Sequence, residues 1–476
     1  MIKIAKILLI NPPQISDGKF LDGYQGTRPV LPPLGLAYIA AYLEKQNYKV
    51  DIFDGMVENA SAKEIALRTH GYDLVGITSI TFQAMITYQV LQEIKRENPT
   101  IPVVIGGPHV SCLPLEPLEK GLADFSVIGE GEEVLFSIIN AIEKGEDFTS
   151  LSGVAYKVNG QIYPAKNSGI VKDINSLPLP ARHLLPMKKY RTSGVRTRRY
   201  PAMSMVTSRG CPMQCSFCFN QLPYRKIVRF LSAERIIEEM TQLISKYGAK
   251  EIHFWDDNFL VNKPRINRFF EIMESRNMNI SFDCEGTINS FDPEVLKKLK
   301  KIGCYSVSYG IESGNQRILD LMGKKISIEQ IKRVVSETKK LGLDARGYFL
   351  FGFPTETKKE ILDTINFSRE LKLTDATFSL FVPLPGTAAY EMVKEEPEFM
   401  KNYWYRLILS EISFPRPPLV YHPSSVNEDE LLHLHRVALR KFYLQPQQIL
   451  NKLSRCFKSY RLFKESLKGL RSLIKG

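Results

Sequence analysis

Short apolar runs and segments of helical spacing alternate through the first 145 residues, and this alternation limits the fold more than any other feature of the chain. The apolar runs with strand character end at Ile10, Phe53, Thr78, Ile105 and Ile128. Continuous apolar strands that alternate with helices form parallel sheets with helices on both faces. Residues 1–145 are therefore predicted to form an N-terminal α/β domain with a doubly wound, Rossmann-like parallel sheet.

Polar and glycine-rich segments follow several of these strands. In a parallel sheet the carboxyl ends of the strands meet at one edge, where ligands bind, and glycine lets the backbone approach a bulky ligand. The candidate contacts are Asn11, Pro12, Thr78, Ser79, Gly106, Gly107, His109, Gly129 and Glu130. Ordinary strand-to-helix turns favour the same residue types, so this pattern alone leaves both interpretations open.

Residues 146–200 are predicted to connect two domains. Asn159-Gly160 lies between two short alternating runs, which is a strong signal for a β-hairpin, and prolines punctuate the segment after it. The arginines that precede the next strand are Arg191, Arg196, Arg198 and Arg199. We interpret them as part of a solvated interdomain loop; the alternative is contact with anionic groups of a cofactor or substrate.

A second alternation of strands and helices runs from residue 201 to residue 390. Its apolar runs end near Thr207, Trp255, Cys284, Tyr309, Phe351 and Val382. Six strand–helix repeats predict a partial (β/α)6 barrel of the TIM type. Because barrels place their chemistry at the carboxyl ends of their strands, we expect the functional residues of this domain directly after these runs.

Three of the seven cysteines lie within eight residues, directly after the first strand of this second domain. Cys211, Cys215 and Cys218 are spaced C-x3-C-x2-C, and three thiolates can hold three irons of a 4Fe-4S cluster, which commonly has four cysteine ligands. The fourth iron is then open to a substrate or cofactor. A zinc knuckle is the alternative, but zinc needs four ligands, and no further His or Cys lies near in sequence.

The segment Cys211-x3-Cys215-x-Phe217-Cys218 resembles the C-x3-C-x-aromatic-C signature of the radical S-adenosylmethionine (SAM) superfamily. The resemblance implies that SAM chelates the open iron, and that one electron from the cluster cleaves SAM to methionine and a 5′-deoxyadenosyl radical. It also implies SAM contacts at Phe217, Asp256, Glu312, Ser313, Gly352 and Pro354. A helix cap at Asp256 and a salt bridge on the barrel floor at Glu312 are the structural alternatives.

The strand-end segments of the first domain are similar to those of the cobalamin-binding domain that precedes the radical SAM domain in one large subfamily. These segments are Asn11-Pro12-Pro13, Thr78-Ser79, Gly106-Gly107-Pro108-His109 and Gly129-Glu130-Gly131-Glu132. The resemblance implies that a corrin lies flat across the strand ends. The Asp-x-His-x-x-Gly motif, which supplies an axial histidine in cobalamin mutases, is absent, so we expect His109 at the corrin edge or its tail, or as a helix cap.

That subfamily includes radical SAM C-methyltransferases and the anaerobic Mg-protoporphyrin ester oxidative cyclase. We therefore expect methylation of an unactivated carbon, with radical cyclisation or rearrangement as the alternative. A tRNA methylthiotransferase would need three more N-terminal cysteines, where only Cys112 is present; a non-catalytic zinc or nucleic-acid-binding module is the remaining alternative. The expected partners are a small-molecule or lipid substrate and a one-electron reductant of the flavodoxin or ferredoxin type.

Residues 391–476 are predicted to form a helical, basic C-terminal extension. Eleven basic residues and one acidic residue, Glu465, follow Leu431, so most of the net charge of +13 lies here. Apolar residues recur at spacings of three and four from Leu453 to Ile474, which indicates an amphipathic helix. The helix would dock on an anionic membrane surface, pack on the enzyme body or bind RNA; its aromatic residues lie on the apolar stripe, which argues against nucleic acid.

Two further features bear on where the protein works. The sequence has no apolar run of about 18 residues, the length that a membrane-spanning helix needs, and its cysteines outside the motif are isolated, so they form no disulfide framework. We therefore expect a cytoplasmic protein, with peripheral contact at the inner face of the membrane through its C-terminal helix.

Overall fold

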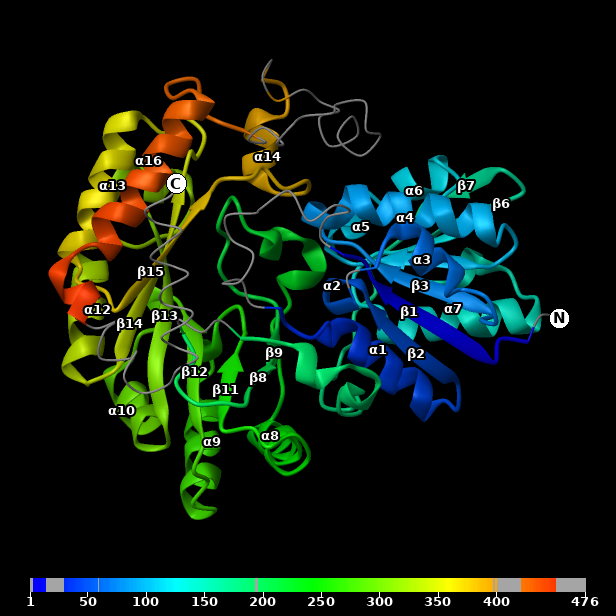
Figure 1. Cartoon of the computed structure of the whole chain (residues 1–476), viewed down its shortest axis with the longest axis horizontal. Coiled ribbons are helices and arrows are strands. Elements are labelled where there is room, and N and C mark those ends of the chain that lie inside the picture. Colours follow the sequence, from blue (N-terminus) through cyan, green and yellow to red (C-terminus); the bar gives the residue numbers. More distant parts are fainter. Residues whose placement is uncertain are drawn as a thin grey trace.

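A computed structural model of the chain describes residues 3–13, 30–58, 60–192, 196–396, 399 and 421–450. Within these residues the chain forms two α/β units that stand side by side, the N-terminal unit on the right of Figure 1 and the second unit on the left. The amphipathic helix predicted between Leu453 and Ile474 lies outside the described residues. No helix in the described ranges is both long and apolar enough to span a membrane.

The N-terminal unit is built on a sheet with the strand order β2-β1-β3-β4-β5-β6-β7, in which β1 to β5 are parallel. The parallel strands are β1 (Lys6–Asn11), β2 (Lys49–Asp54), β3 (Leu74–Thr78), β4 (Val103–Gly106) and β5 (Phe125–Val127). The main helices are α1 (Leu34–Lys45), α3 (Ala62–Leu67), α4 (Ala84–Glu97) and α7 (Glu132–Lys144), and the short ones are α2 (Gly55–Glu58), α5 (Pro108–Cys112) and α6 (Glu116–Glu119). The predicted parallel α/β architecture is confirmed.

Helices cover both faces of this sheet because its strands are apolar on both sides. Ile7 and Leu9 of β1 pack with residues of α1 and α7 in one core, whereas Leu8 and Ile10 pack with residues of α3 and α4 in a second core. Successive side chains of a strand point to opposite faces, so one continuous apolar run fills both cores. After Lys6 at its start, the next polar residue of β1 is Asn11, at the carboxyl end of the strand.

The hairpin predicted at Asn159-Gly160 belongs to the same sheet. β6 (Val154–Val158) pairs antiparallel with β5, and β7 (Gln161–Tyr163) pairs antiparallel with β6. Asn159 and Gly160 have φ values of 49° and 81°, as a two-residue turn between right-twisted strands requires. The sheet is therefore mixed at this edge and continues past residue 145, into the segment that the sequence suggests is a connector.

The second unit is a parallel sheet with the strand order β15-β14-β13-β12-β11-β8. Its strands are β8 (Ala202–Met205), β11 (Glu251–Phe254), β12 (Ser281–Gly286), β13 (Cys304–Glu312), β14 (Asp344–Phe351) and β15 (Asp375–Leu380). Its outer helices are α8 (Ala233–Tyr247), α9 (Lys263–Ser275), α10 (Pro293–Lys301), α12 (Ile328–Lys340) and α13 (Lys358–Glu370) (Figure 1). Because β8 and β15 are the two edges of the sheet and do not pair, the predicted partial barrel is confirmed.

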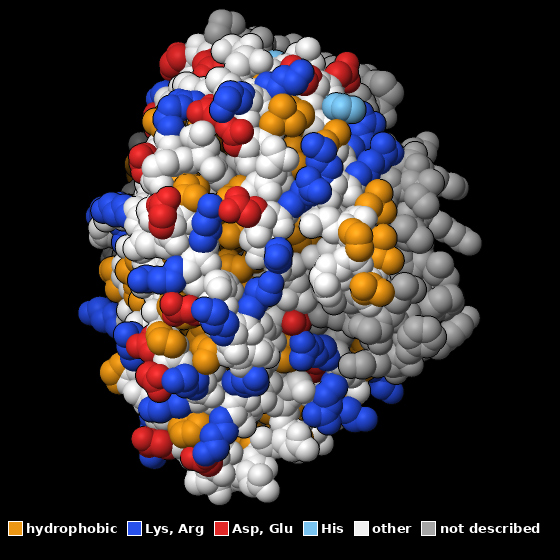
Figure 2. Space-filling model, turned by 90° about the vertical axis from the view of Figure 1, so that its left-hand side faces the viewer, with side chains coloured by type: hydrophobic (Ala, Val, Ile, Leu, Met, Phe, Trp, Pro, Cys, Tyr) orange, Lys and Arg blue, Asp and Glu red, His pale blue; other side chains and the backbone are white. Residues whose placement is uncertain are grey.

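Helix α16 (Glu428–Tyr443) completes the outer wall of the barrel beside α13 (Figure 1). The Tyr443 hydroxyl donates to Asp375 Oδ1 (2.6 Å) and to Ala376 O (2.7 Å), which fixes the helix to β15. Two shorter helices, α11 (Gln316–Leu321) and α14 (Ala388–Val393), lie between these elements in sequence. Figure 2 shows the outer face of this unit, where Lys and Arg side chains are interspersed with Asp and Glu, as on an ordinary solvated surface.

Candidate active site

A cavity of about 420 Å³ lies between the two units, at the carboxyl ends of both sheets. Its wall on the N-terminal side includes Thr78, Gly106 and Gly129, which end or follow β3, β4 and β5. Its wall on the barrel side includes Ser208 and Trp255, which follow β8 and β11. A ligand in this cavity therefore contacts both units, at the strand ends where α/β folds bind ligands.

The N-terminal wall of the cavity is rich in glycine, with apolar side chains such as Ile77 and Val104 between the glycines. The glycines that line it are Gly35, Gly76, Gly106, Gly107, Gly129 and Gly131. Gly129 has a φ of 94°, and a Cβ atom there would collide with Gly169 O, so this turn requires glycine. A wall of glycines and apolar side chains fits the broad, flat corrin that the sequence resemblance implies.

The predicted corrin contacts divide into two groups. Those that line the cavity are Thr78, Gly106, Gly107, Gly129 and Glu130, and those that do not are Asn11, Pro12, Ser79 and His109. Asn11 Nδ2 donates to Asp54 Oδ1 (2.8 Å), and Ser79 N donates to Gly106 O (2.8 Å). Pro12 O accepts a hydrogen bond from Gln83 Nε2 (2.8 Å). These three residues therefore hold the strand-end loops in place.

His109 is fully buried and faces away from the cavity. Its Nδ1 lies 3.4 Å from Thr81 Oγ1, its Nε2 lies 3.7 Å from Glu116 Oε2, and its ring meets the Tyr88 ring edge-on. Within the described part of the chain, no imidazole, thiol or thioether lines the cavity. The geometry thus provides no side chain of these kinds at the cavity wall to ligate cobalt.

The three motif cysteines lie in a loop held between a short ribbon and two helices. β9 (Ser208–Arg209) pairs antiparallel with β10 (Arg229–Phe230), and the loop between them carries the motif. Cys211 N donates to Arg225 O (3.1 Å), Ser216 N donates to Met322 O at the end of α11 (2.9 Å), and Ala389 N of α14 donates to Ser216 O (2.8 Å). These bonds fix the loop at both of its sides.

The thiols of Cys211, Cys215 and Cys218 form one group. Burial raises the pKa of all three thiols, that of Cys215 to about 11, and Cys218 further raises the pKa of both others, as expected of neighbouring thiols. The ammonium group of Lys324 lowers the pKa of Cys211 and Cys215 and pairs with Glu312 Oε1 at 3.2 Å. Metal binding would have to displace the thiol protons.

This donor set fits a 4Fe-4S cluster better than a single zinc ion. Among the described residues, no three His, Cys, Asp or Glu side chains converge tightly enough to hold one metal ion. In a cluster each thiolate binds a different iron, so its cysteines stand further apart than the ligands of one ion. Three cysteines with a buried cation, Lys324, beside them suit an anionic cluster that has one iron without a protein ligand.

The residue predicted to receive the SAM amino group, Asp256, is buried and bonded to the chain itself. Its carboxylate accepts from Thr207 N (3.1 Å), from Thr207 Oγ1 (2.8 Å) and from the Ser208 hydroxyl. The next residue, Asp257, is the one that lines the cavity, and it pairs with Arg225 (2.8 Å). The sequence prediction placed the contact at Asp256 rather than Asp257. A shift of one position along the chain decides which of two neighbouring side chains faces the cavity, and the sequence does not show that direction.

The other predicted SAM contacts lie around the barrel mouth in different environments. Glu312 ends β13, with φ of 67°, and points to Lys324 beside the cysteines. The Ser313 hydroxyl lies 3.1 Å from Thr364 Oγ1 and accepts from Asn315 N (3.1 Å), so it supports the start of α11. Phe217 is half-buried against apolar side chains.

Gly352 and Pro354 follow β14 in a turn that a buried acid organises. Glu356 Oε2 accepts from Gly352 N (2.6 Å) and Phe353 N (3.2 Å), and burial raises the pKa of Glu356 to about 8. Leu431 of α16 packs against Gly352, where a Cβ atom would come within 2.7 Å of it. Pro354 is buried in the same turn.

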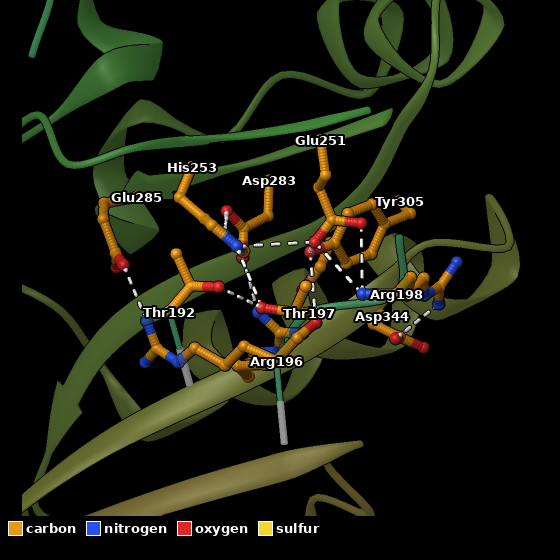
Figure 3. A network of polar contacts seen from close by, with 12 residues as sticks. Thr192, Arg196, Thr197, Arg198, Glu251, His253, Asp283, Glu285, Tyr305 and Asp344 are labelled. Atoms are coloured by element: carbon orange, nitrogen blue, oxygen red, sulfur yellow. Dashed lines mark hydrogen bonds and ion pairs between the residues drawn. The ribbon is translucent and has the colours of Figure 1, made fainter. Parts of the chain in front are cut away.

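The interior of the barrel holds a polar network that sequence reasoning did not anticipate (Figure 3). Arg196 enters the barrel, where its guanidinium contacts Glu285 Oε1 (3.2 Å) and the Tyr348 hydroxyl and lies 5.4 Å from the Trp255 ring centre. The interpretation of this arginine as part of a solvated loop is wrong, because its side chain is only 11% exposed. Inward-facing carboxylates on the strands draw it into the barrel.

The same network continues below Arg196. His253 Nδ1 lies 2.6 Å from Asp283 Oδ1, and Arg346 Nη1 donates to Asp283 Oδ2 (2.7 Å). The guanidinium of Arg346 and the imidazole of His253 hold the pKa of Asp283 at about 2, although burial alone would raise it. Arg198 N donates to Glu251 (3.1 Å), which ties the segment before β8 across the end of the barrel (Figure 3).

Comparisons with known proteins bear on both units. The radical SAM superfamily model matches residues 205–368, and the B12-binding domain model matches residues 27–139. A Pyrococcus horikoshii protein named uncharacterized methyltransferase is 35% identical, over 94% of this chain and 95% of that protein. The anaerobic magnesium-protoporphyrin IX monomethyl ester cyclase of Rubrivivax gelatinosus is 25% identical, over 92% of this chain and 77% of the cyclase.

The fold is shared with a solved structure. The radical SAM methyltransferase TsrM from Kitasatospora setae, with cobalamin and a 4Fe-4S cluster bound, matches with a TM-score of 0.69 and 18% identity, over 93% of this chain and 90% of that one. The glycine-lined wall and the three-cysteine loop thus coincide with two matched domains. The chain belongs to the radical SAM superfamily, in the branch that carries a B12-binding domain, and its cofactors are a 4Fe-4S cluster, SAM and cobalamin.

Proposed function

We propose that the protein methylates an unactivated carbon of a small-molecule or lipid substrate. One observation carries the proposal: a single cavity is lined on one side by the glycine-rich strand ends of the B12-binding domain and on the other by the ribbon that leads into the cysteine loop. When bound, the cluster and SAM supply hydrogen-atom abstraction, and cobalamin supplies the methyl group. The protein's part is to hold these groups and the substrate carbon together.

The residues of the chain divide this work. Cys211, Cys215 and Cys218 hold the cluster, and the buried Lys324 offsets part of its negative charge. Burial of the loop keeps water from the cluster. The bare backbone at Gly106 and its neighbours provides a flat seat for the corrin.

The substrate is proposed to lie in the cavity against Trp255, next to the polar groups within the barrel. Trp255 lines the cavity, and Arg196, Glu285 and Tyr348 stand beside it with hydrogen-bonding groups. Such a chamber would orient a polar part of the substrate while its reacting carbon faces the cavity. The observation that supports this position is that Trp255 lines the cavity and also contacts the Arg196 guanidinium of the barrel interior.

Radical cyclisation with the same cofactors is the second candidate. It is favoured by the similarity to the cyclase of Rubrivivax gelatinosus, which covers 92% of this chain. The two reactions leave different products. Methylation yields S-adenosylhomocysteine and 5′-deoxyadenosine together, whereas cyclisation yields 5′-deoxyadenosine without S-adenosylhomocysteine.

The test is anaerobic turnover of the reconstituted holoenzyme with cobalamin, methyl-deuterated SAM, a one-electron reductant and a small-molecule and lipid extract. We expect both nucleoside products and a new deuterated methyl species in the mass spectrum. Cys215→Ala should abolish 5′-deoxyadenosine and leave the corrinoid bound. Formation of 5′-deoxyadenosine without S-adenosylhomocysteine or label transfer would refute methylation and favour cyclisation.

The electron is proposed to come from a flavodoxin or ferredoxin of the cytoplasm. The support is chemical: the cluster must be reduced by one electron at a time, and nothing among the described residues provides a second redox centre. Reduced flavodoxin or ferredoxin should replace a chemical reductant in the turnover assay. Failure of both, with dithionite active, would contradict this part of the proposal.

A further inference from the structure

Two arginines flank the cysteine loop at a single point of the ribbon. Arg209 of β9 and Arg229 of β10 are direct cross-strand partners. Arg209 stands two residues before Cys211, so the loop with all three cysteines leaves the ribbon at Arg209 and returns to it at Arg229. Whatever holds these two side chains therefore holds both ends of the cluster-binding loop.

Two glutamates of the B12-binding domain hold them. Arg229 binds Glu130 through both ends of its guanidinium, with Nη1 to Oε2 at 2.7 Å and Nη2 to Oε1 at 2.8 Å. Arg209 Nη2 donates to Glu132 Oε1 (2.5 Å), and its Nη1 lies 3.3 Å from Glu130 Oε2. We call these four residues, Glu130, Glu132, Arg209 and Arg229, the clasp.

The clasp is buried, so solvent does little to weaken it. The exposed fractions of the side chains are 11% for Glu130, 4% for Glu132, 9% for Arg229 and 20% for Arg209. The two positive and two negative charges balance. The two parallel hydrogen bonds from the Arg229 guanidinium to one carboxylate also fix the orientation of that pair. Glu132 also begins α7, where the partial positive charge of the helix end favours a carboxylate.

The backbone of the clasp glutamates lies where the corrin is expected. Gly129, Glu130, Gly131 and Glu132 are consecutive and all line the cavity. The Glu130 carboxylate, however, is taken up by Arg229, Arg209 and the Val171 N–H (2.8 Å). One short segment therefore lines the corrin seat with its backbone and holds the cluster loop with its side chains.

We propose that Glu130 and Glu132 are positioning residues that set the distance and orientation between the corrin and the cluster, rather than ligands of the corrin through their carboxylates. The proposal rests on the proposed function for its purpose, because two cofactors that act in turn on one carbon must keep a fixed separation. Without the clasp, both cofactors would still find their own ligands. Their separation would then vary with the motion between the two units.

The first experiment measures that separation in the reconstituted holoenzyme. Cob(II)alamin and the reduced cluster each carry an unpaired electron, so their dipolar coupling in an electron paramagnetic resonance spectrum reports the distance. In Glu132→Gln we expect wild-type iron and corrinoid contents but a weaker and broader coupling. Glu133→Gln, on the exposed neighbour in the same helical turn, should retain the wild-type coupling. Wild-type coupling in Glu132→Gln, or loss of corrinoid from it, would overturn the proposal.

The second experiment needs no cofactor. Hydrogen exchange of the full-length apoprotein should be about tenfold faster in residues 208–230 of Glu132→Gln than of wild type, because local opening costs less when an anchor is lost. Unchanged exchange there would overturn the clasp. If the wild-type protein takes up iron but no corrinoid, the proposed function is refuted. The hydrogen-exchange rates of the apoprotein would still show whether the clasp holds the cysteine loop. If Glu132→Gln fails to fold, the same measurements are made on Arg229→Lys. Lysine keeps the positive charge but cannot form the two parallel hydrogen bonds to Glu130, so we expect the same weaker coupling and faster exchange.

Discussion

The two walls of the central cavity are built in different ways. The N-terminal wall combines six glycines with apolar side chains such as Ile77 and Val104, and the Asn11 side chain turns away from it to brace the strand ends. The barrel side is rich in charge: Arg209, Arg225, Arg229 and Asp257 line the cavity there, and Arg196, Glu285 and Arg346 lie in the barrel interior. One wall thus offers shape to a large flat ligand, and the other offers charge and hydrogen bonds.

This difference matches what each side must do. A corrin presents a broad face whose binding depends on close approach of the backbone, so side chains at the glycine positions would obstruct it. An anionic cluster and a polar sulfonium need fixed counter-charges in a space without water. The comparison therefore predicts that the barrel side will be sensitive to loss of charge and the N-terminal side to gain of volume.

The largest expected effect is loss of a charge inside the barrel. Arg346→Met leaves the buried Asp283 carboxylate without its guanidinium partner, and breaking a buried pair in this way costs about 3–5 kcal/mol of unfolding free energy. Denaturant unfolding measures it. Arg268→Met, which removes an exposed pair with Glu234, should cost much less, because solvent screens that pair. Equal losses in the two variants would show that burial of the charge is not what matters.

Gain of volume on the glycine wall should have the next largest effect. Gly129→Ala places a Cβ atom against Gly169 O at a positive φ, which costs about 1–3 kcal/mol and displaces the strand end. We expect corrinoid content to fall while iron content stays at the wild-type level, both measured on the same reconstituted sample. Gly145→Ala, at a positive φ with open space around it, is the control for backbone strain alone. Normal corrinoid uptake by Gly129→Ala would contradict the role given to this wall.

A buried acid at the barrel mouth sharpens the comparison through pH. Because burial raises the pKa of Glu356 from 4.5 to about 8, the folded state keeps a proton that the unfolded state has lost between these values. Wild-type stability should therefore fall as pH rises through this range. Glu356→Gln removes the titration, so its stability relative to wild type should rise by roughly 4 kcal/mol from pH 5 to pH 8.5, because the shift acts over nearly three pH units and one pKa unit is about 1.4 kcal/mol.

The measurement for Glu356 is the midpoint of thermal unfolding as a function of pH. Glu329→Gln, on an exposed position of α12, should give a curve parallel to wild type. A Glu356→Gln curve that also ran parallel to wild type would show that the carboxyl group is ionised in the folded protein throughout.

The smallest effect on either wall is expected from removal of residues 451–476. The basic amphipathic helix predicted there should bind anionic lipid rather than the enzyme body, so the shortened protein should keep its iron and corrinoid. The fraction of protein that sediments with anionic phosphatidylglycerol vesicles should be lower for the shortened protein than for the full-length protein. Neutral phosphatidylcholine vesicles should bind neither of the two proteins. Loss of both cofactors on truncation would instead favour packing of the helix on the enzyme.

The repeating pattern of the chain predicted the fold well. Alternation predicts a helix over residues 84–97, and α4 spans Ala84–Glu97; the six strands of the barrel also appear in the predicted order. Such elements are readable from sequence because the side chains of a whole segment share one period. Which strands pair with one another is harder to predict from sequence. The hairpin at Asn159-Gly160 could have stood alone, but it extends the first sheet.

Individual site residues were harder to predict because the direction of a side chain depends on packing. Asp256 and Asp257 differ by one position, yet the first braces the ribbon and the second lines the cavity. Arg196 looks like a surface residue until the inward carboxylate of Glu285, on β12, is placed beside it. The cysteines are the exception, because their spacing predicts a cluster site, and the radical SAM superfamily model matches the residues around them.

The central claim is that one chain holds a cluster and a corrin on opposite walls of one cavity. The most direct test is analysis of iron, sulfide and corrinoid in a single sample of anaerobically reconstituted wild-type protein after gel filtration. The account predicts about four irons, about four sulfides and one corrinoid per chain in the same monodisperse peak. Zinc in place of iron, or uptake of either cofactor only at the expense of the other, would contradict it.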